Sequence, residues 1–88
     1  MQRYVITVTG KVQGVFFRDS ARRKALGLHL HGFARNDPDG SVYIEVEGDE
    51  DGLRQFLWWC AKGSDEAKVT NVSHIEQKPT GHQGFEVR

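Results

Sequence analysis

The segment YVITVTGKVQGVFFR, residues 4–18, contains the changes of pattern that indicate how the chain folds. Residues 4–9 alternate between two faces and are rich in β-branched side chains, which predicts a strand with one buried face. Residues 10–17 contain two glycines and show no helical period, so we expect a loop there. In residues 18–28 apolar side chains recur at helical spacing, and Gly27 is expected to cap this helix. The segment therefore predicts a strand, a glycine-containing loop and a helix in succession.

Further strands and a second helix are predicted outside this segment. Residues 30–36 and 42–47 are predicted strands, and the Asp-Pro-Asp-Gly turn between them suits a hairpin, because proline fixes φ and glycine accepts a positive φ. Residues 49–63 begin with three acids, carry an apolar stripe at helical spacing and end in glycine, which predicts a helix. The last two strands are expected at residues 69–75 and 85–88.

The order strand-helix-strand-strand-helix-strand is the split βαβ, or ferredoxin-like, arrangement. It predicts an α+β fold in which an antiparallel sheet carries both helices on one face, followed by a short additional strand. At 88 residues the chain fits one domain, which we expect to span residues 1–88. Many unrelated functions share this fold, so function has to be argued from particular residues.

Composition excludes several classes of protein. No apolar run approaches the ~20 residues needed to cross a bilayer, and the N-terminus lacks the pattern of a signal peptide, so we expect a cytoplasmic protein without membrane contact. Cys60 is the only cysteine, which excludes an internal disulfide and a multi-cysteine metal site. Twelve basic residues balance twelve acidic ones, and no basic stripe suited to nucleic acid runs through the chain. We expect a monomer with no nucleic-acid partner.

The first 36 residues hold seven basic residues and one acid, Asp19, and this local positive charge suits a small anion. The glycine-containing loop leads into a helix whose first N–H groups lack intrahelical partners and carry the positive end of the helix dipole. Such a position binds phosphate or carboxylate, and Arg18 adds a planar guanidinium that can hold two oxygens. A P-loop requires Lys and then Ser or Thr after its last glycine, whereas Gly14 is followed by Val15 and Phe16. The dinucleotide-binding pattern Gly-x-Gly-x-x-Gly is absent as well. These residues favour a site for one phosphate group, with an ordinary loop and a solvated arginine as the open alternative.

Asn36 ends the second predicted strand, next to the turn. Its side chain donates and accepts hydrogen bonds, so it can hold a water molecule by the side-chain oxygen and direct that water at phosphorus. An asparagine before Asp-Pro-Asp-Gly is also what the entry to a turn favours. The residue alone does not separate these two interpretations.

Two stretches of the sequence resemble the signatures of a known family. Residues 10–18 follow the pattern Gly-x-Val-Gln-Gly-Val-x-Phe-Arg, and residues 32–42 follow Gly-Phe-Ala-Arg-Asn-x-x-x-Gly-x-Val, with Gly48 after them. These patterns, their separation, the chain length and the closing residues 84–88 are similar to those of the acylphosphatases. The resemblance covers essentially the whole chain.

The resemblance implies a stand-alone enzyme that hydrolyses the carboxyl–phosphate bond of small-molecule acyl phosphates and releases inorganic phosphate. It implies that Arg18 binds the phosphoryl group and that Asn36 orients the attacking water. It also implies a phosphate-binding loop made of the backbone amides of Gln13, Gly14, Val15, Phe16 and Phe17. No metal and no other cofactor is expected. The leaving carboxylate has a conjugate acid with a pKa near ~4 and needs no general acid, and we expect a phosphate oxygen to take the proton of the water.

Other residues are weaker candidates for a site. His29 and His31 are expected on the same side of a strand, but no third metal ligand is evident. Cys60 belongs to the apolar stripe of the second helix and is expected to be buried. Only one of the adjacent residues Trp58 and Trp59 can face the core fully.

Two other functions remain open at this point. The main alternative is a ferredoxin-like binding module for RNA or a small anion, with Tyr43 as a stacking residue, although the basic and aromatic signature of RNA-binding domains is missing. The second alternative is a domain that acts on carbamoyl phosphate within a larger protein. A chain that ends with the domain favours the stand-alone enzyme.

Overall fold

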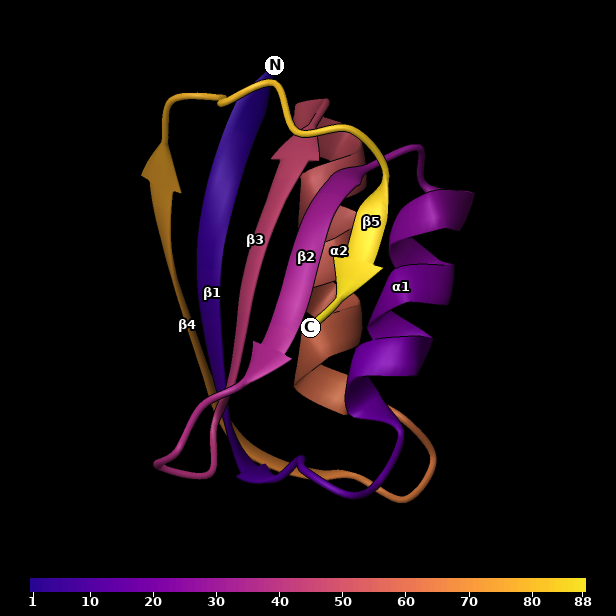
Figure 1. The fold of residues 1–88 in the computed structure, drawn as a ribbon, viewed down its shortest axis with the longest axis vertical. Coiled ribbons are helices and arrows are strands. Elements are labelled where there is room, and N and C mark those ends of the chain that lie inside the picture. The colour runs from indigo at the N-terminus through magenta and orange to yellow at the C-terminus, as the bar shows by residue number, and fades with distance from the viewer.

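The computed structural model describes all 88 residues, from Met1 to Arg88. In chain order the elements are β1 Gln2–Lys11, α1 Phe17–Gly27, β2 His31–Asn36, β3 Val42–Gly48, α2 Glu50–Lys62, β4 Lys68–Gln77 and β5 Phe85–Val87. The strands form one sheet in the order β4-β1-β3-β2-β5, and both helices lie against one face of it (Figure 1). No helix is long and apolar enough to cross a membrane.

The pairing of the strands follows the split βαβ arrangement. β1 lies between β3 and β4 and pairs antiparallel with both, and β2 pairs antiparallel with β3. Each helix therefore connects two parallel strands that have one other strand between them. β5 pairs parallel with β2, which makes the five-stranded sheet mixed, whereas the other four strands are antiparallel as expected. The ferredoxin-like α+β fold predicted from the sequence is confirmed.

Alternation along the two central strands builds the core. The helix-facing side chains of β1 and β3 lie opposite one another in three pairs: Tyr4 with Val46, Ile6 with Ile44, and Val8 with Val42. All of them are buried because the helices cover this face. α2 adds the side chains of its predicted apolar stripe, of which Leu53, Phe56 and Cys60 are fully buried.

The first strand is longer than the alternation predicts. β1 continues to Lys11, through residues expected in a loop, because Gly10 forms a bulge at which the pairing with β4 shifts. Gly10 has a φ of 123°, and a Cβ there would lie 2.2 Å from the carbonyl oxygen of Lys68. Only glycine permits this approach of two backbones. β4 is likewise longer than the predicted span of residues 69–75.

The end of the first helix also differs from the expectation. Gly27 is the last helical residue, and the left-handed residue that follows the helix is His29, with a φ of 60°. The His29 N–H donates to the carbonyl of Leu26, and the Leu30 N–H donates to the carbonyl of Ala25. These two bonds form a Schellman motif. The predicted cap at Gly27 was wrong, because the helix ends where Leu30 enters the core.

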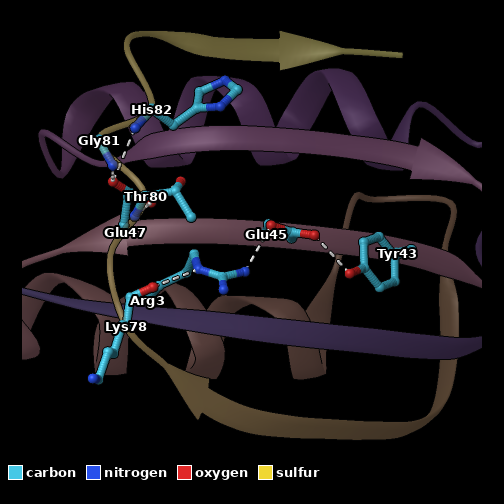
Figure 2. A network of polar contacts seen from close by, with 8 residues as sticks. All are labelled: Arg3, Tyr43, Glu45, Glu47, Lys78, Thr80, Gly81 and His82. Atoms are coloured by element: carbon cyan, nitrogen blue, oxygen red, sulfur yellow. Dashed lines mark hydrogen bonds and ion pairs between the residues drawn. The ribbon is translucent and has the colours of Figure 1, made fainter.

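A buried carboxylate, Glu47 on β3, fastens the connection between β4 and β5 (Figure 2). Its oxygens accept hydrogen bonds from the backbone N–H groups of Thr80, Gly81 and His82 at 3.1, 2.7 and 3.0 Å, and from the Thr80 hydroxyl at 3.0 Å. Burial raises the pKa of Glu47, but these hydrogen bonds together outweigh burial and lower it. Glu47 thereby fixes the segment that leads into β5.

Candidate functional site

Four segments meet towards one end of the molecule: the loop after β1, the start of α1, the end of β2 and the end of β5 (Figure 1). Between them lies a cavity of about 350 Å³. It is lined by Val12, Gly14, Phe16, Phe17, Arg18, Asp19, Asn36 and Val87. The structure therefore brings Arg18 and Asn36 together with three residues of the predicted phosphate-binding loop.

The side chains of the other two loop residues, Gln13 and Val15, point elsewhere. The Gln13 amide group donates to the carbonyls of Asp37 and Ser41 at 2.8 and 2.9 Å, which ties the loop to the hairpin between β2 and β3. Val15 is buried in the core, and its carbonyl accepts a hydrogen bond of 2.7 Å from the Ser64 hydroxyl. Gln13 and Val15 can contribute only their backbone to the cavity, and their side chains hold the loop in place.

The backbone of this loop has N–H groups without partners in the protein. The N–H groups of residues 13–16 donate to no backbone carbonyl and to no side chain, and Phe17 is the first residue of α1. Gly14 and Phe16 are both left-handed, with φ of 76° and 61°. A left-handed residue followed by a right-handed helical one turns successive N–H groups towards a common point, where they attract an anion. We call the N–H groups of residues 13–17 the amide cradle.

The start of α1 is held by aromatic packing. The Phe17 ring lies against the Trp59 ring, with 5.1 Å between the centroids. Gly63, at the end of α2, leaves room for that ring, because a Cβ there would lie 2.7 Å from Phe17 Cε2. Neither Gly63 nor Ser64 was predicted to support the site. Their only sequence signal is the glycine that ends the second helix.

Arg18 lines the cavity and contacts the far end of the chain. Its Nη1 donates to the backbone oxygen of Arg88 at 2.5 Å, although the two residues are 70 positions apart. The neighbouring carboxylate, Asp19, accepts a hydrogen bond of 2.8 Å from Arg23 Nη2. The Arg88 contact orients the Arg18 guanidinium through one nitrogen, and Asp19 is engaged one turn along the helix.

Asn36 occupies the last position of β2, on the face that the helices cover. It pairs with the buried residue Val42 on β3, which places its side chain on the inner face of the sheet. Asn36 Oδ1 is buried and accepts no hydrogen bond from the protein. Leaving a buried acceptor unpaired costs about 1–3 kcal/mol. Asn36 thus carries an unused acceptor, and the residue lines the cavity that contains Arg18.

The predicted histidine pair is separated by the structure. His29 lies in the connection before β2, so the two histidines do not share a strand face. His31 Nδ1 instead accepts a hydrogen bond of 2.9 Å from the Gly84 N–H. The Cys60 thiol is fully buried, and burial raises its pKa, so the thiol stays protonated and unreactive. The expectation that Cys60 is a buried apolar residue is confirmed.

A larger, apolar hollow of about 560 Å³ lies between α2 and β4. Trp58 lines it and is 85% exposed, whereas Trp59 is half-buried against the core, so only one tryptophan faces inward as expected. The one arginine that lines the hollow, Arg54, forms an ion pair of 2.8 Å with Asp51. This hollow contains no group that resembles the cradle or the unpaired Asn36 oxygen.

Comparisons with known proteins agree on one family. Residues 4–87 match the family model described as Acylphosphatase. The curated proteins named acylphosphatase from Thermotoga maritima and Thermotoga petrophila are 48% identical to this chain over all 88 residues, which cover 98% of their length.

Solved structures extend the same likeness to the fold. The acylphosphatase of Bacillus subtilis superposes with a TM-score of 0.98 at 38% identity, covering 100% of this chain and 99% of that one. Full-length HypF, in a form with phosphate and nucleotide bound, contains a similar domain with a TM-score of 0.92 at 26% identity, covering 99% of this chain and 12% of that one. The match of the family model over nearly all of the sequence shows that this chain belongs to the acylphosphatase family, enzymes that hydrolyse acyl phosphates.

Proposed function

We propose that the protein hydrolyses acyl phosphates by attack of water on phosphorus, within the cavity formed by the amide cradle, Arg18 and Asn36. One observation carries this mechanism: the same cavity is lined by Gly14 and Phe16, whose N–H groups have no partner, by Arg18, and by Asn36, whose buried side-chain oxygen has no partner. The donors suit the oxygens of a phosphoryl group, and the acceptor suits an O–H group of water.

The cradle and Arg18 hold the phosphoryl group. N–H groups at the N-terminus of α1 carry the positive end of the helix dipole, which stabilises an anion. The Arg18 guanidinium is a planar donor that can bond two oxygens of the same anion. Its contact with the Arg88 oxygen uses Nη1, so the remaining N–H groups are available to substrate. Charge that develops on the equatorial oxygens in the transition state is stabilised by donors already in position.

Asn36 positions the nucleophile. Its Oδ1 accepts a hydrogen bond from the water, which directs a lone pair of the water oxygen at phosphorus. Holding the water and the phosphoryl group in line makes the reaction effectively unimolecular. Asn36 acts only by position and neither gives nor takes a proton.

The bond changes balance without a general acid. The water oxygen forms a bond to phosphorus, the bond between phosphorus and the acyl oxygen breaks, and its electron pair leaves on a carboxylate. A phosphate oxygen takes the proton of the water. Asp19 is the carboxylate nearest to this role, but Arg23 already holds it. A pH–rate profile of Asp19→Asn that loses an acidic limb present in the parent, where the rate rises with pH as a catalytic base loses its proton, would assign the proton to Asp19 instead.

The test is hydrolysis of benzoyl phosphate in ¹⁸O-labelled water, without added metal. We expect label in the released phosphate and none in the benzoate, because water attacks phosphorus. Label in the benzoate would show attack on the carbonyl carbon, and the roles given to Arg18 and Asn36 would be wrong.

A further inference from the structure

Phe16 is an unusual residue in two respects. Its backbone is left-handed, with φ of 61° and ψ of 26°, a region that bulky side chains adopt only as outliers. Its side chain is 74% exposed, so an aromatic ring faces solvent. Both features are unfavourable for the folded state, and such strained positions cluster at functional sites.

The neighbours of Phe16 show that core packing does not explain it. Val15 and Phe17, on either side, are 3% and 1% exposed and belong to the core cluster. The Phe17 ring packs against Trp59, whereas no aromatic ring of the protein pairs with Phe16. Of the three consecutive apolar residues 15–17, only Phe16 therefore points its side chain outward, at the left-handed position.

The exposed ring borders the cavity of the proposed site. Arg18, Asp19 and Asn36 form its polar part. Phe16 and Val87, the latter 42% exposed, give it an apolar part open to solvent. The volume of about 350 Å³ exceeds what a phosphoryl group needs. In an in-line displacement the acyl group leaves on the side of phosphorus opposite the water. Phe16 belongs to the wall made by the start of α1, and not to the β2 wall that carries Asn36.

We infer that Phe16 is a specificity-determining residue that contacts the acyl part of the substrate. The inference rests on the proposed function and names its substrate class: acyl phosphates with aromatic or extended apolar acyl groups, in preference to acetyl phosphate. An aromatic ring gains offset or edge contact with Phe16, and the single methyl group of acetyl phosphate is too small to cover it.

The test compares kcat/KM for benzoyl phosphate and acetyl phosphate in Phe16→Asn, Phe16→Tyr and the parent protein. Asparagine tolerates the left-handed conformation and removes the ring, whereas tyrosine keeps the ring. We expect the ratio of benzoyl to acetyl phosphate to fall about fivefold in Phe16→Asn, on the scale of an aromatic contact, and to be kept in Phe16→Tyr. The Phe16 amide belongs to the cradle, so a substitution here can also lower kcat/KM for both substrates equally. Such a common loss reports the cradle, and only a change in the ratio reports the ring.

Leu26→Asn is the matched control, since Leu26 is an exposed apolar residue of α1 that does not line the cavity. A ratio that is unchanged in Phe16→Asn, or that falls equally in Leu26→Asn, overturns the inference. If Phe16→Asn does not fold, Phe16→Leu decides by the same ratio. Arg18→Lys is the arm for the proposed function: full activity on both substrates in that variant refutes the mechanism, whatever the Phe16 variants do.

Discussion

Two segments of this protein each gather main-chain N–H groups around one point, and they differ in what accepts the hydrogen bonds. In residues 80–82 three consecutive N–H groups donate to the carboxylate of Glu47. In the amide cradle the N–H groups of residues 13–16 donate to no atom of the protein. Residues 80–82 carry an internal anion and are structural. The cradle has the same kind of donor with no internal acceptor, which suits an anion from outside.

The surroundings of the two segments also differ, because one is closed around a buried carboxylate and the other borders a cavity. Glu47 is 3% exposed and its two oxygens are used by the loop that covers it. The cradle borders a cavity that is also lined by Arg18 and by Asn36, whose side-chain oxygen has no partner. Changes in the cradle should therefore affect turnover, and changes around Glu47 should affect stability.

The largest effect is expected for Arg18→Lys. A point charge does not replace a planar donor, so kcat/KM for benzoyl phosphate should fall roughly 1,000-fold, which is about 4 kcal/mol of transition-state stabilisation. The matched control is Arg22→Lys, one helical turn further along the exposed side of α1. Steady-state kinetics that place Arg18→Lys within a few-fold of the parent would remove Arg18 from the site.

Asn36→Ala should lose roughly 100-fold in kcat, because the water is no longer held in line with the bond that breaks. Inhibition by inorganic phosphate should persist, since the cradle is intact. The control is Asn71→Ala, on the exposed edge strand β4. If the alanine variant of Asn36 instead unfolds, as thermal denaturation would show, then Asn36 serves the turn and not the reaction.

Glu47→Gln should destabilise the fold by roughly 2 kcal/mol, because a charged acceptor of four hydrogen bonds becomes a neutral one. The folded-state pKa of Glu47 is lowered, so the stability it adds is complete above the unfolded pKa of about 4.3 and is lost as pH falls through the folded value. Denaturant unfolding at several pH values should show that the difference in unfolding free energy between parent and variant narrows as pH falls below the unfolded pKa of about 4.3. A constant gap down to pH 2 would disprove this account of Glu47.

The smallest effect, and the sharpest contrast, comes from two glycines. Gly14 and Gly81 have φ of 76° and 81°, and an added Cβ meets nothing within 4 Å at either position. Gly14→Ala and Gly81→Ala should each cost about 1 kcal/mol of stability through backbone strain. Only Gly14→Ala should also lower kcat/KM, by roughly tenfold. Equal losses of activity in the two variants would mean that the cradle and the Glu47 loop do not differ in function.

Local patterns predicted most of the fold. The alternation of Tyr4, Ile6 and Val8 requires only that one face be buried, and the structure buries it. The failures depend on contacts between distant segments. The bulge at Gly10 depends on the approach of β4, and the end of α1 depends on where Leu30 enters the core.

The site was less accessible to local reasoning. From its place in the sequence, Asn36 is either a turn residue or a ligand for water, and only the family resemblance distinguishes the two roles. The structure adds that its Oδ1 is buried and unpaired, which depends on the register of β2 against β3. The contact between Arg18 and Arg88 and the bond from Ser64 to Val15 join residues 70 and 49 positions apart, so no short pattern contains them.

The most direct test follows the backbone amides of ¹⁵N-labelled protein by NMR while inorganic phosphate is added. The amide signals of residues 13–17 should shift and saturate together, while those of residues 80–82 stay where they are because Glu47 already occupies them. Saturable shifts centred anywhere other than residues 13–17, or none at all, would contradict the claim that the amide cradle binds the phosphoryl group.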